Sequence, residues 1–427
     1  MSYDLFIAIR IGTNYTHCAW GDNSKKDPTL VPVQSDNSDS TNRTDNTSDD
    51  TPSLVVFSSD IRYPYFGYDA LRRIEAQDNE DYIFPKIVKN LFCRNDEIPI
   101  FIPAKNGFVL SSHDIIEKVI RYLLNQINSN VRGSIRRQFI FTVPTISTDE
   151  AFPFMKECIG NNGIPEDQAV IIPEAVSVFQ YCRIHHNVYK SLSGENVEAF
   201  SPGKRSVVLE CEDDYMTFSI LELMDDNSLE LLYSHSEDVL VSYQVQEEFK
   251  NIISKMFGKT VFDDFYSQCR ADYFRLFSDF CRNMTKDLHG KEPLVITMPS
   301  SLSALVTDKT GKSINQAIEQ TDIAQKIAYT SGKLKIAPEI YQSLFLEAAT
   351  HTVNLLRKGF QQSGSEYVVN IILAGYFSRS TIIQDHIRMS FPSYQLIVPK
   401  DGDLAVVKGA ALYGQAPVTY RKASNIV

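Results

Sequence analysis

The chain has 427 residues, 43% of them hydrophobic and 22% charged, which is the composition of a folded protein large enough for more than one core. Its formal charge of -11 argues against a nucleic-acid partner, because such partners normally require a basic face. No apolar run is long enough to cross a bilayer and no secretory leader precedes the first strand, so we expect a cytoplasmic protein without a membrane partner.

The first half of the chain alternates short apolar strands with amphipathic helices. Strands are predicted at 5–11, 54–57 and 139–143, where β-branched and aromatic residues gather. A helix is predicted over 112–128, because apolar residues recur there at helical spacing and Ser111 with Asp114 fits a capping box at its start. Residues 34–51 contain no apolar side chain, so we expect a disordered loop there.

The second half repeats this alternation. Strands are predicted at 207–209, 216–223, 294–298 and 368–374, and a helix that begins at Pro338 is predicted over 338–361. Interleaved strands and helices of this length indicate an α/β architecture with covered sheets. The seven cysteines show no CxxC spacing, so neither a zinc site nor a disulfide framework is indicated.

Four stretches, taken in chain order, resemble the nucleotide-binding domain of the heat-shock protein 70 family, and within it a divergent branch that lacks the usual peptide-binding domain. In that family they are the first phosphate loop, the segment connecting the lobes, the second phosphate loop, and the adenosine loop with its crossover helix. They read AIRIGTNYTHCAW at 8–20, FIFTVPTISTDEAFPFMKECIGNNGI at 139–164 with IIPEAVSVFQYC at 171–182, VVLECEDDYMTFSIL at 207–221, and IILAGYFSRSTIIQDHI at 371–387 with VPKDGDLAVVKGAALYG at 398–414.

This resemblance implies an actin-like ATPase fold, in which two lobes, each with a central mixed sheet flanked by helices, surround a nucleotide cleft. It divides the chain into lobe I at 1–205, with a disordered insert at about 24–51, and lobe II at 206–400. A crossover helix and tail at 401–427 return towards lobe I. ATP and magnesium are the cofactors that the resemblance implies, if the family activity is retained.

Two loops of the expected nucleotide site depart from the family pattern while keeping a turn. The aspartate of the first phosphate loop is Arg10, a cation where the family holds the water shell of the metal. The candidate phosphate-binding residues of this loop are Gly12, Thr13, Asn14 and Tyr15, although such a turn also forms without a ligand. In the adenosine loop, the expected pair of glycines is Gly375 followed by Tyr376.

The second phosphate loop departs further. The family pattern of Asp, any residue, three glycines and Thr is replaced here by Glu210, Cys211, Glu212, Asp213, Asp214 and Tyr215. Acidic side chains thus stand where a triphosphate would lie, and each pair of unit charges at about 4 Å repels by roughly 4 kcal/mol at an effective dielectric of 20. In the alternative interpretation, residues 212–214 form an exposed acidic turn. Both interpretations remove phosphate binding.

The remaining catalytic and base-binding positions are also changed. The family has a glutamate before the proline of the connecting segment, whereas this chain has Ile172 there, and Glu174 would reach the cleft only if the strand end is shifted. The adenine-binding Glu and Lys align with Cys281 and Met284. Lys286 and Lys89 are weaker matches to family lysines.

Three hypotheses follow. The leading one is a pseudo-ATPase without cofactor or metal that acts as an interaction or regulatory protein for an unknown protein partner. The alternative is a weak, chaperone-like ATPase with Glu210 and Glu174 as catalytic residues. A cation-binding module built from Glu210 and residues 212–214 is the least favoured, because the spacing is not that of an EF-hand.

Arg10 lies at the end of an apolar strand, where an unpaired buried charge would be unfavourable. We therefore predict an ion pair across the cleft between Arg10 and either Glu210 or the acidic turn at 212–214. The alternative is that Arg10 points into a water-filled cleft.

Overall fold

The structure is a computed structural model that describes residues 3–24, 27–33, 51–75, 81–84, 86–93, 97–131, 136–147, 149–185, 188–190, 196–212, 215–238, 241–284, 292–363 and 367–423. Most of the loop predicted at 34–51, and most of the insert expected at about 24–51, lie outside the described residues. The insert expected at about 24–51, however, was too long at both ends. Thr29–Val31 form β3 and Thr51–Pro52 form β4, because both segments pair with β2 (Tyr15–Gly21).

The central sheet of lobe I has the strand order β11, β10, β1, β2, β3, with β4 also on β2. Strands β1, β10 and β11 run parallel, whereas β2 and β3 are antiparallel to their neighbours. Every residue of β1 is buried, as expected for a strand covered on both faces. The three parallel strands are β1 (Leu5–Ile11), β10 (Arg137–Val143) and β11 (Ala169–Pro173).

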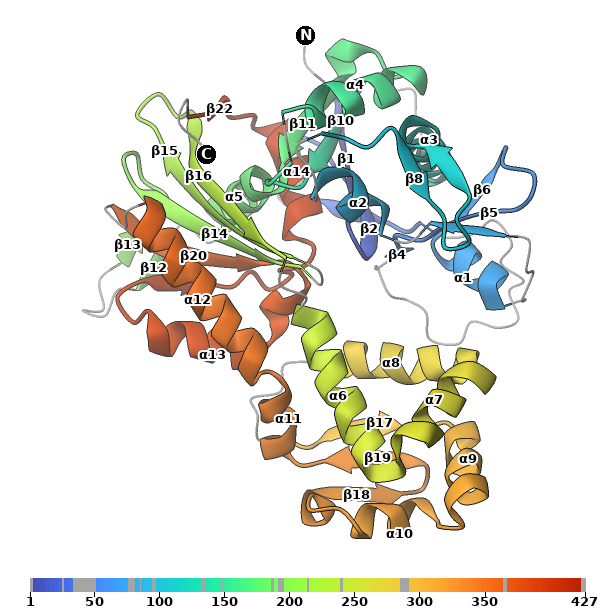
Figure 1. The fold of residues 1–427 in the computed structure, drawn as a ribbon. Helices are drawn as coiled ribbons and strands as arrows, with labels where there is room; N and C mark the ends of the chain where they lie inside the picture. Colours follow the sequence, from blue (N-terminus) through green and yellow to red (C-terminus); the bar gives the residue numbers. More distant parts are fainter. Residues whose placement is uncertain are drawn as a thin grey trace.

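The central sheet of lobe II repeats this plan (Figure 1). Its order is β21, β20, β14, β15, β16, β22; β14, β20 and β21 are parallel, β15 is antiparallel to both β14 and β16, and β22 is parallel to β16. Five strands therefore match lobe I in order and direction. The strands are β14 (Arg205–Cys211), β15 (Met216–Leu223), β16 (Leu229–Glu237), β20 (Val368–Ala374), β21 (Gln395–Ile397) and β22 (Tyr420–Lys422).

Two helices pack against each other between the sheets. Helix α5 (Glu174–His185) follows β11, and α14 (Ala405–Gln415) follows β21 and packs on β1, β2 and β10 of the other lobe. Gly409 permits this crossing, because a Cβ there would lie 1.9 Å from the backbone oxygen of Ser177. Buried apolar residues of both sheets and both helices form one shared core at this place, including Phe6, Val208 and Val407.

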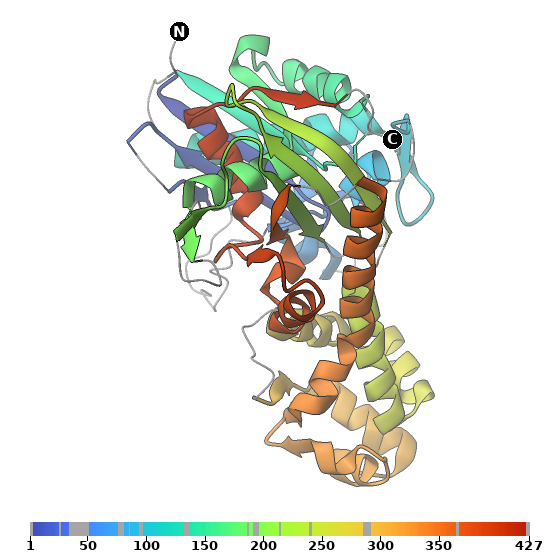
Figure 2. The same ribbon diagram turned by 90° about the vertical axis from the view of Figure 1, so that its left-hand side faces the viewer.

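Smaller units extend from both lobes. In lobe I, these are the β6–β5–β7 sheet, the β8–β9 hairpin and four helices. In lobe II, residues 241–344 form a separate group of helices and a small sheet below the central sheet, seen in both views (Figures 1 and 2). Their bounds are β5 (Val55–Phe57), β6 (Pro64–Phe66), α1 (Tyr68–Glu75), β7 (Tyr82–Phe84), α2 (Ile87–Phe92), β8 (Phe101–Pro103), β9 (Val109–Ser111), α3 (Ser112–Asn130), α4 (Ala151–Asn161), α6 (Val241–Phe257), α7 (Lys259–Gln268), α8 (Arg270–Met284), β17 (Leu294–Thr297), α9 (Ser300–Thr310), α10 (Ile314–Glu319), β18 (Ile327–Thr330), β19 (Lys333–Ile336) and α11 (Pro338–Leu344).

One of the two predicted helices is confirmed and the other is corrected. Helix α3 begins after Ser111, whose hydroxyl accepts a hydrogen bond from the backbone N–H of Asp114 at 3.4 Å. The helix predicted over 338–361 is instead two, α11 and α12 (Leu346–Ser363), with Phe345 between them. Phe345 is fully buried, and its ring packs edge-on against Tyr341 and against the distant Phe377, with centroids 5.2 and 6.5 Å apart, so tertiary packing fixes the break.

The outer elements complete the two lobes. Helix α13 (Thr381–Ser390) packs beside α12, and the short strands β12 (Val188–Lys190) and β13 (Asn196–Glu198) form a hairpin before β14. Within the described residues, no helix combines the length and the apolar character needed to cross a membrane.

Candidate functional site

Two matching hairpins form the site, one from each lobe. Strand β1 turns into β2 through a four-residue turn in which the Gly12 N–H donates to the Tyr15 oxygen at 3.1 Å. Strand β14 turns into β15 in the same way, with the Glu212 N–H donating to the Tyr215 oxygen at 3.1 Å. A Cβ at Gly12 would lie 2.4 Å from the Tyr15 oxygen, so the first turn requires glycine at this position.

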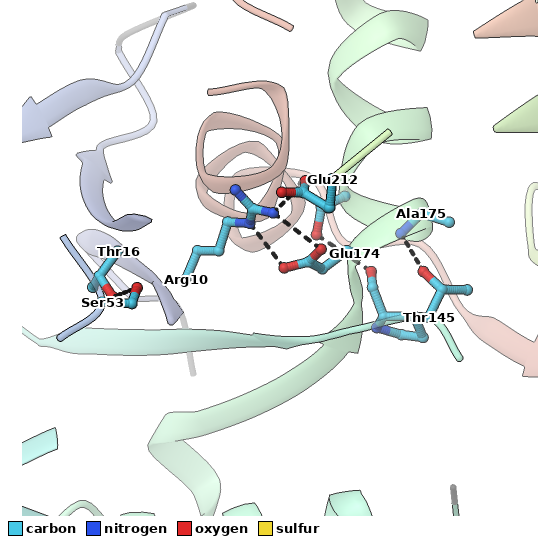
Figure 3. Close-up of polar contacts among 9 residues, drawn as sticks. Arg10, Thr16, Ser53, Thr145, Glu174, Ala175 and Glu212 are labelled. Carbon is cyan, nitrogen blue, oxygen red and sulfur yellow. Dashed lines mark hydrogen bonds and ion pairs between the residues drawn. The ribbon is translucent and has the colours of Figure 1, made fainter. Parts of the chain in front are cut away.

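The Arg10 guanidinium joins the two hairpins (Figure 3). Its Nε donates to Glu174 Oε1 at 2.8 Å, and its Nη2 donates to Glu174 Oε2 at 3.3 Å and to Glu212 Oε1 at 2.7 Å. Arg10, Glu174 and Glu212 are 3%, 1% and 6% exposed. The predicted ion pair across the cleft is therefore confirmed for the acidic turn, through Glu212, and the water-filled alternative is wrong.

Glu174 is the partner that the sequence did not assign to Arg10. It is the first residue of α5, where the N-terminal end of a helix favours a carboxylate. The backbone N–H of Ala175 donates to Thr145 Oγ1 at 2.8 Å, which anchors this end of the helix to the loop after β10. Glu174 thus reaches the cleft, while Ile172 lies buried in β11. The carboxylate of Glu174 in lobe I and that of Glu212 in lobe II bind the Arg10 guanidinium from two sides.

Glu210 lies on β14 at 2% exposure, and neither of its carboxyl oxygens has a hydrogen-bond partner among the described residues. Burial raises the pKa of Glu210 well above its ordinary value, and the nearby Glu174 raises it further. The Thr145 hydroxyl and Arg10 oppose this shift without cancelling it. Arg10 does not bind Glu210, so that half of the predicted pairing was wrong.

The other charges of the cluster are also shifted. Burial raises the pKa of Glu212, and the charge of Arg10 opposes the shift. Burial alone would lower the pKa of Arg10, but Glu174 and Glu212 hold it well above its ordinary value, so the guanidinium stays charged. The exposed acidic turn expected at 212–214 is wrong for the buried Glu212. Asp213 and Asp214 lie outside the described residues.

The adenosine loop closes against the second hairpin. Gly375 has a φ of 87°, and a Cβ there would lie 2.5 Å from the Cys211 oxygen and 2.9 Å from Glu212 Oε1. The next residue, Tyr376, stacks on Tyr15 of lobe I with ring centroids 5.6 Å apart and planes at 29°. Gly375 therefore faces protein atoms, and two aromatic rings meet across the lobes.

Lys89 forms a further contact between the lobes. It lies on α2 at 3% exposure, and its Nζ is 3.3 Å from Asp238 Oδ1, just after β16. Of the other residues aligned with base-binding positions, Cys281 and Met284 belong to α8, and Lys286 lies outside the described residues.

Two other predicted residues occupy the first turn. The Thr13 hydroxyl is buried and has no hydrogen-bond partner among the described residues, so it is the feature of this loop that best suits a ligand. The Asn14 oxygen accepts from the Ser53 N–H at 2.7 Å, which ties the turn to lobe I.

Taken together, these residues do not fit magnesium and a triphosphate. A guanidinium stands where the metal shell would be, and the Glu212 carboxylate replaces a phosphate-binding glycine. No group of three or more His, Cys, Asp or Glu side chains in the described part of the chain is arranged to hold a metal ion. Two cavities, of about 620 and 380 Å³, are lined by residues 152–171 and 248–351 respectively, and neither is lined by a hairpin residue.

Comparison with known proteins supports the resemblance. No protein-family model matches the chain. Heat shock 70 kDa protein 12A of Mus musculus is 21% identical over 434 residues, which cover 87% of this chain and 64% of that protein. The Homo sapiens proteins 12A and 12B are each 21% identical over 433 residues, covering 87% of this chain and 64% and 63% of theirs. The chain thus spans slightly less than two thirds of these relatives.

Proposed function

Because the chain resembles the heat-shock protein 70 family over most of its length and has the actin-like ATPase fold, we propose that it is a pseudo-ATPase. It binds no magnesium nucleotide, hydrolyses none, and acts as an interaction or regulatory protein. The observation that carries this proposal is the Arg10 guanidinium, buried between Glu174 and Glu212 at the point where the two phosphate hairpins meet. A protein partner and a cytoplasmic location belong to the same proposal.

The free energy of nucleotide binding supports the pseudo-ATPase proposal. A triphosphate would have to separate Arg10 from Glu212 and leave a buried charge unpaired, which costs about 3–5 kcal/mol when one partner of such a pair is removed. Micromolar binding supplies roughly 8 kcal/mol in total, so this single step removes about half of it. The remaining carboxylates repel the phosphates in addition.

A thermal-shift titration with magnesium and ATP tests the proposal. A ligand present at 100 times its Kd would raise the free energy of unfolding by about 2.7 kcal/mol, which is a visible change in Tm. We expect no saturable rise at millimolar concentration, with or without magnesium. A saturable rise that depends on magnesium would contradict the pseudo-ATPase.

The second candidate function is the weak, chaperone-like ATPase. It is favoured by the unpartnered hydroxyl of Thr13 and by the two carboxyl groups, Glu174 and Glu210, that the fold brings to the cleft. Substrate would have to displace Glu212 from Arg10 before either carboxyl group met a bound water. The same titration separates the two candidates, because hydrolysis requires binding.

A further inference from the structure

The buried cluster between the lobes holds more negative than positive charge. One guanidinium, Arg10, faces three carboxyl groups, Glu174, Glu210 and Glu212, and all four side chains are at least nine-tenths buried. Arg10 binds two of the three, and Glu210 is left without a hydrogen bond from any described residue. With all three carboxyl groups ionised, the four groups would carry a net charge of -2, which is unfavourable in such a place, and a proton on Glu210 reduces it to -1.

We propose that the Arg10 latch, meaning the pairing of Arg10 with Glu174 and Glu212, closes only when Glu210 carries a proton, so that the contact between the lobes is regulated by pH. The inference rests on the proposed function, because it takes the cleft to be free of nucleotide.

The position of Glu210 makes it the group that decides between the open and the closed arrangement of the lobes. It is on lobe II, whereas its neighbour Glu174 is on α5 of lobe I, so an ionised Glu210 repels a charge of the opposite lobe. Glu212, on the same hairpin of lobe II, makes ionisation of Glu210 more costly but does not change its distance from Glu210 when the cleft opens. Opening the cleft separates Glu210 from Glu174 and lets water reach the carboxylate. Loss of the proton therefore favours the open arrangement, and its uptake favours the closed one.

The surrounding groups leave Glu210 as the switch. Burial raises the pKa of Tyr215, Cys211 and Cys93 above their ordinary values, so these neighbours stay neutral as the pH rises through neutrality. His17, opposite Arg10 on β2, acts on Glu212. Lys89 on α2 is paired with Asp238. Among the groups that act most strongly on Glu210, Arg10 supplies the positive charge.

The test compares wild type with Glu210→Gln, which imitates the protonated acid. Dyes attached through unnatural amino acids at Tyr63 of lobe I and Phe274 of lobe II, 77% and 50% exposed, report the distance between the lobes by energy transfer. We expect the wild-type distance to lengthen as the pH rises from about 5 to about 9, and the variant to keep the short distance throughout. Glu230→Gln, on β16, is the matched control and should behave as wild type.

A second readout uses stability. Because the pKa of Glu210 is raised in the folded chain, its contribution to stability is complete below the ordinary carboxyl pKa of 4.5 and is lost as the pH rises towards the folded pKa. The Tm of wild type should therefore fall relative to that of Glu210→Gln with rising pH. If the variant does not fold, titration of the wild-type glutamate carboxyl carbons by NMR decides the matter, since the resonance assigned to Glu210 must titrate well above those of the exposed glutamates.

A wild-type distance that does not change with pH, a variant that keeps the wild-type pH dependence, or the absence of a late-titrating glutamate would overturn the inference. Binding of magnesium and ATP is measured on the same samples. Binding of magnesium and ATP by wild type would contradict the pseudo-ATPase proposal and leave the pH result unaffected. A distance between the lobes that does not change with pH, without nucleotide binding, would contradict only the Arg10 latch.

Discussion

Arg10 is a buried charge that two carboxylates hold from different parts of the chain. A buried ion pair is weak evidence for stability in itself, because desolvation offsets much of the attraction. Removing one partner is different, since it leaves the other charge buried and uncompensated. Arg10 has two such partners, so removal of its side chain would leave two buried carboxylates uncompensated.

We expect Arg10→Ala to lower the free energy of unfolding by about 3–5 kcal/mol, measured by urea denaturation at neutral pH. Arg62→Ala is the matched control, because Arg62 also binds a carboxylate, Asp60, but is 77% exposed at its side chain. The control should leave unfolding nearly unchanged. Equal effects of the two substitutions on the free energy of unfolding would contradict the claim that the buried ion pair stabilises the folded chain.

At this scale the sequence predicted part of the site. A charge at the end of an apolar strand has to find a partner, so the ion pair of Arg10 was predictable from its position alone. Glu174 was not assigned to it, because the place where α5 begins depends on tertiary contacts such as the one from Ala175 to Thr145. Glu212 was ambiguous, because three successive acidic residues also suit an exposed turn.

At the scale of elements, the crossing of α5 and α14 joins the lobes behind the hairpins. Each helix follows the last parallel strand of one sheet, and the two meet where Gly409 lies against Ser177. The crossing sets how closely the sheets approach, and with it the distance over which Arg10 has to reach.

Gly409→Ala should destabilise the protein by about 1–3 kcal/mol, because the added methyl group meets backbone and the helices have to move apart. Gly160→Ala is the control: Gly160 is an exposed residue of α4 whose Cβ would have nothing within 4 Å. There, alanine should stabilise by up to about 1 kcal/mol through helix propensity. Thermal or urea unfolding of both variants measures the difference, and a tolerated Gly409→Ala would mean that the crossing is looser than described.

The elements themselves were predicted unevenly. The ranges 5–11, 216–223 and 368–374 match β1, β15 and β20, because strands buried on both faces read as continuous apolar runs. The helix over 338–361 was wrong, since its apolar stripe continues through Phe345 and the break there comes from packing against other parts of the fold, such as Phe377. Short strands at the rim, such as β3 and β4, carry too few residues to show a pattern.

At the scale of the whole molecule, the two lobes are joined by protein contacts at positions where an ATPase of this fold would hold its nucleotide. The contacts are the Arg10 ion pairs, the stack of Tyr15 on Tyr376, and the pair of Lys89 with Asp238. The resemblance to a known family predicted the two lobes from four motifs in order. It did not predict these contacts, because they are formed by the residues in which this chain departs from that family.

The distance between the lobes, measured by energy transfer between dyes at Tyr63 and Phe274 at a fixed pH of about 5, shows whether the chain itself holds the cleft closed. If the chain itself holds the cleft closed, the distance will form one narrow distribution that is the same without ligand and with millimolar magnesium and ATP, and Arg10→Ala will broaden it. A broad distribution in the unliganded wild type that narrows when magnesium and ATP are added would contradict the account.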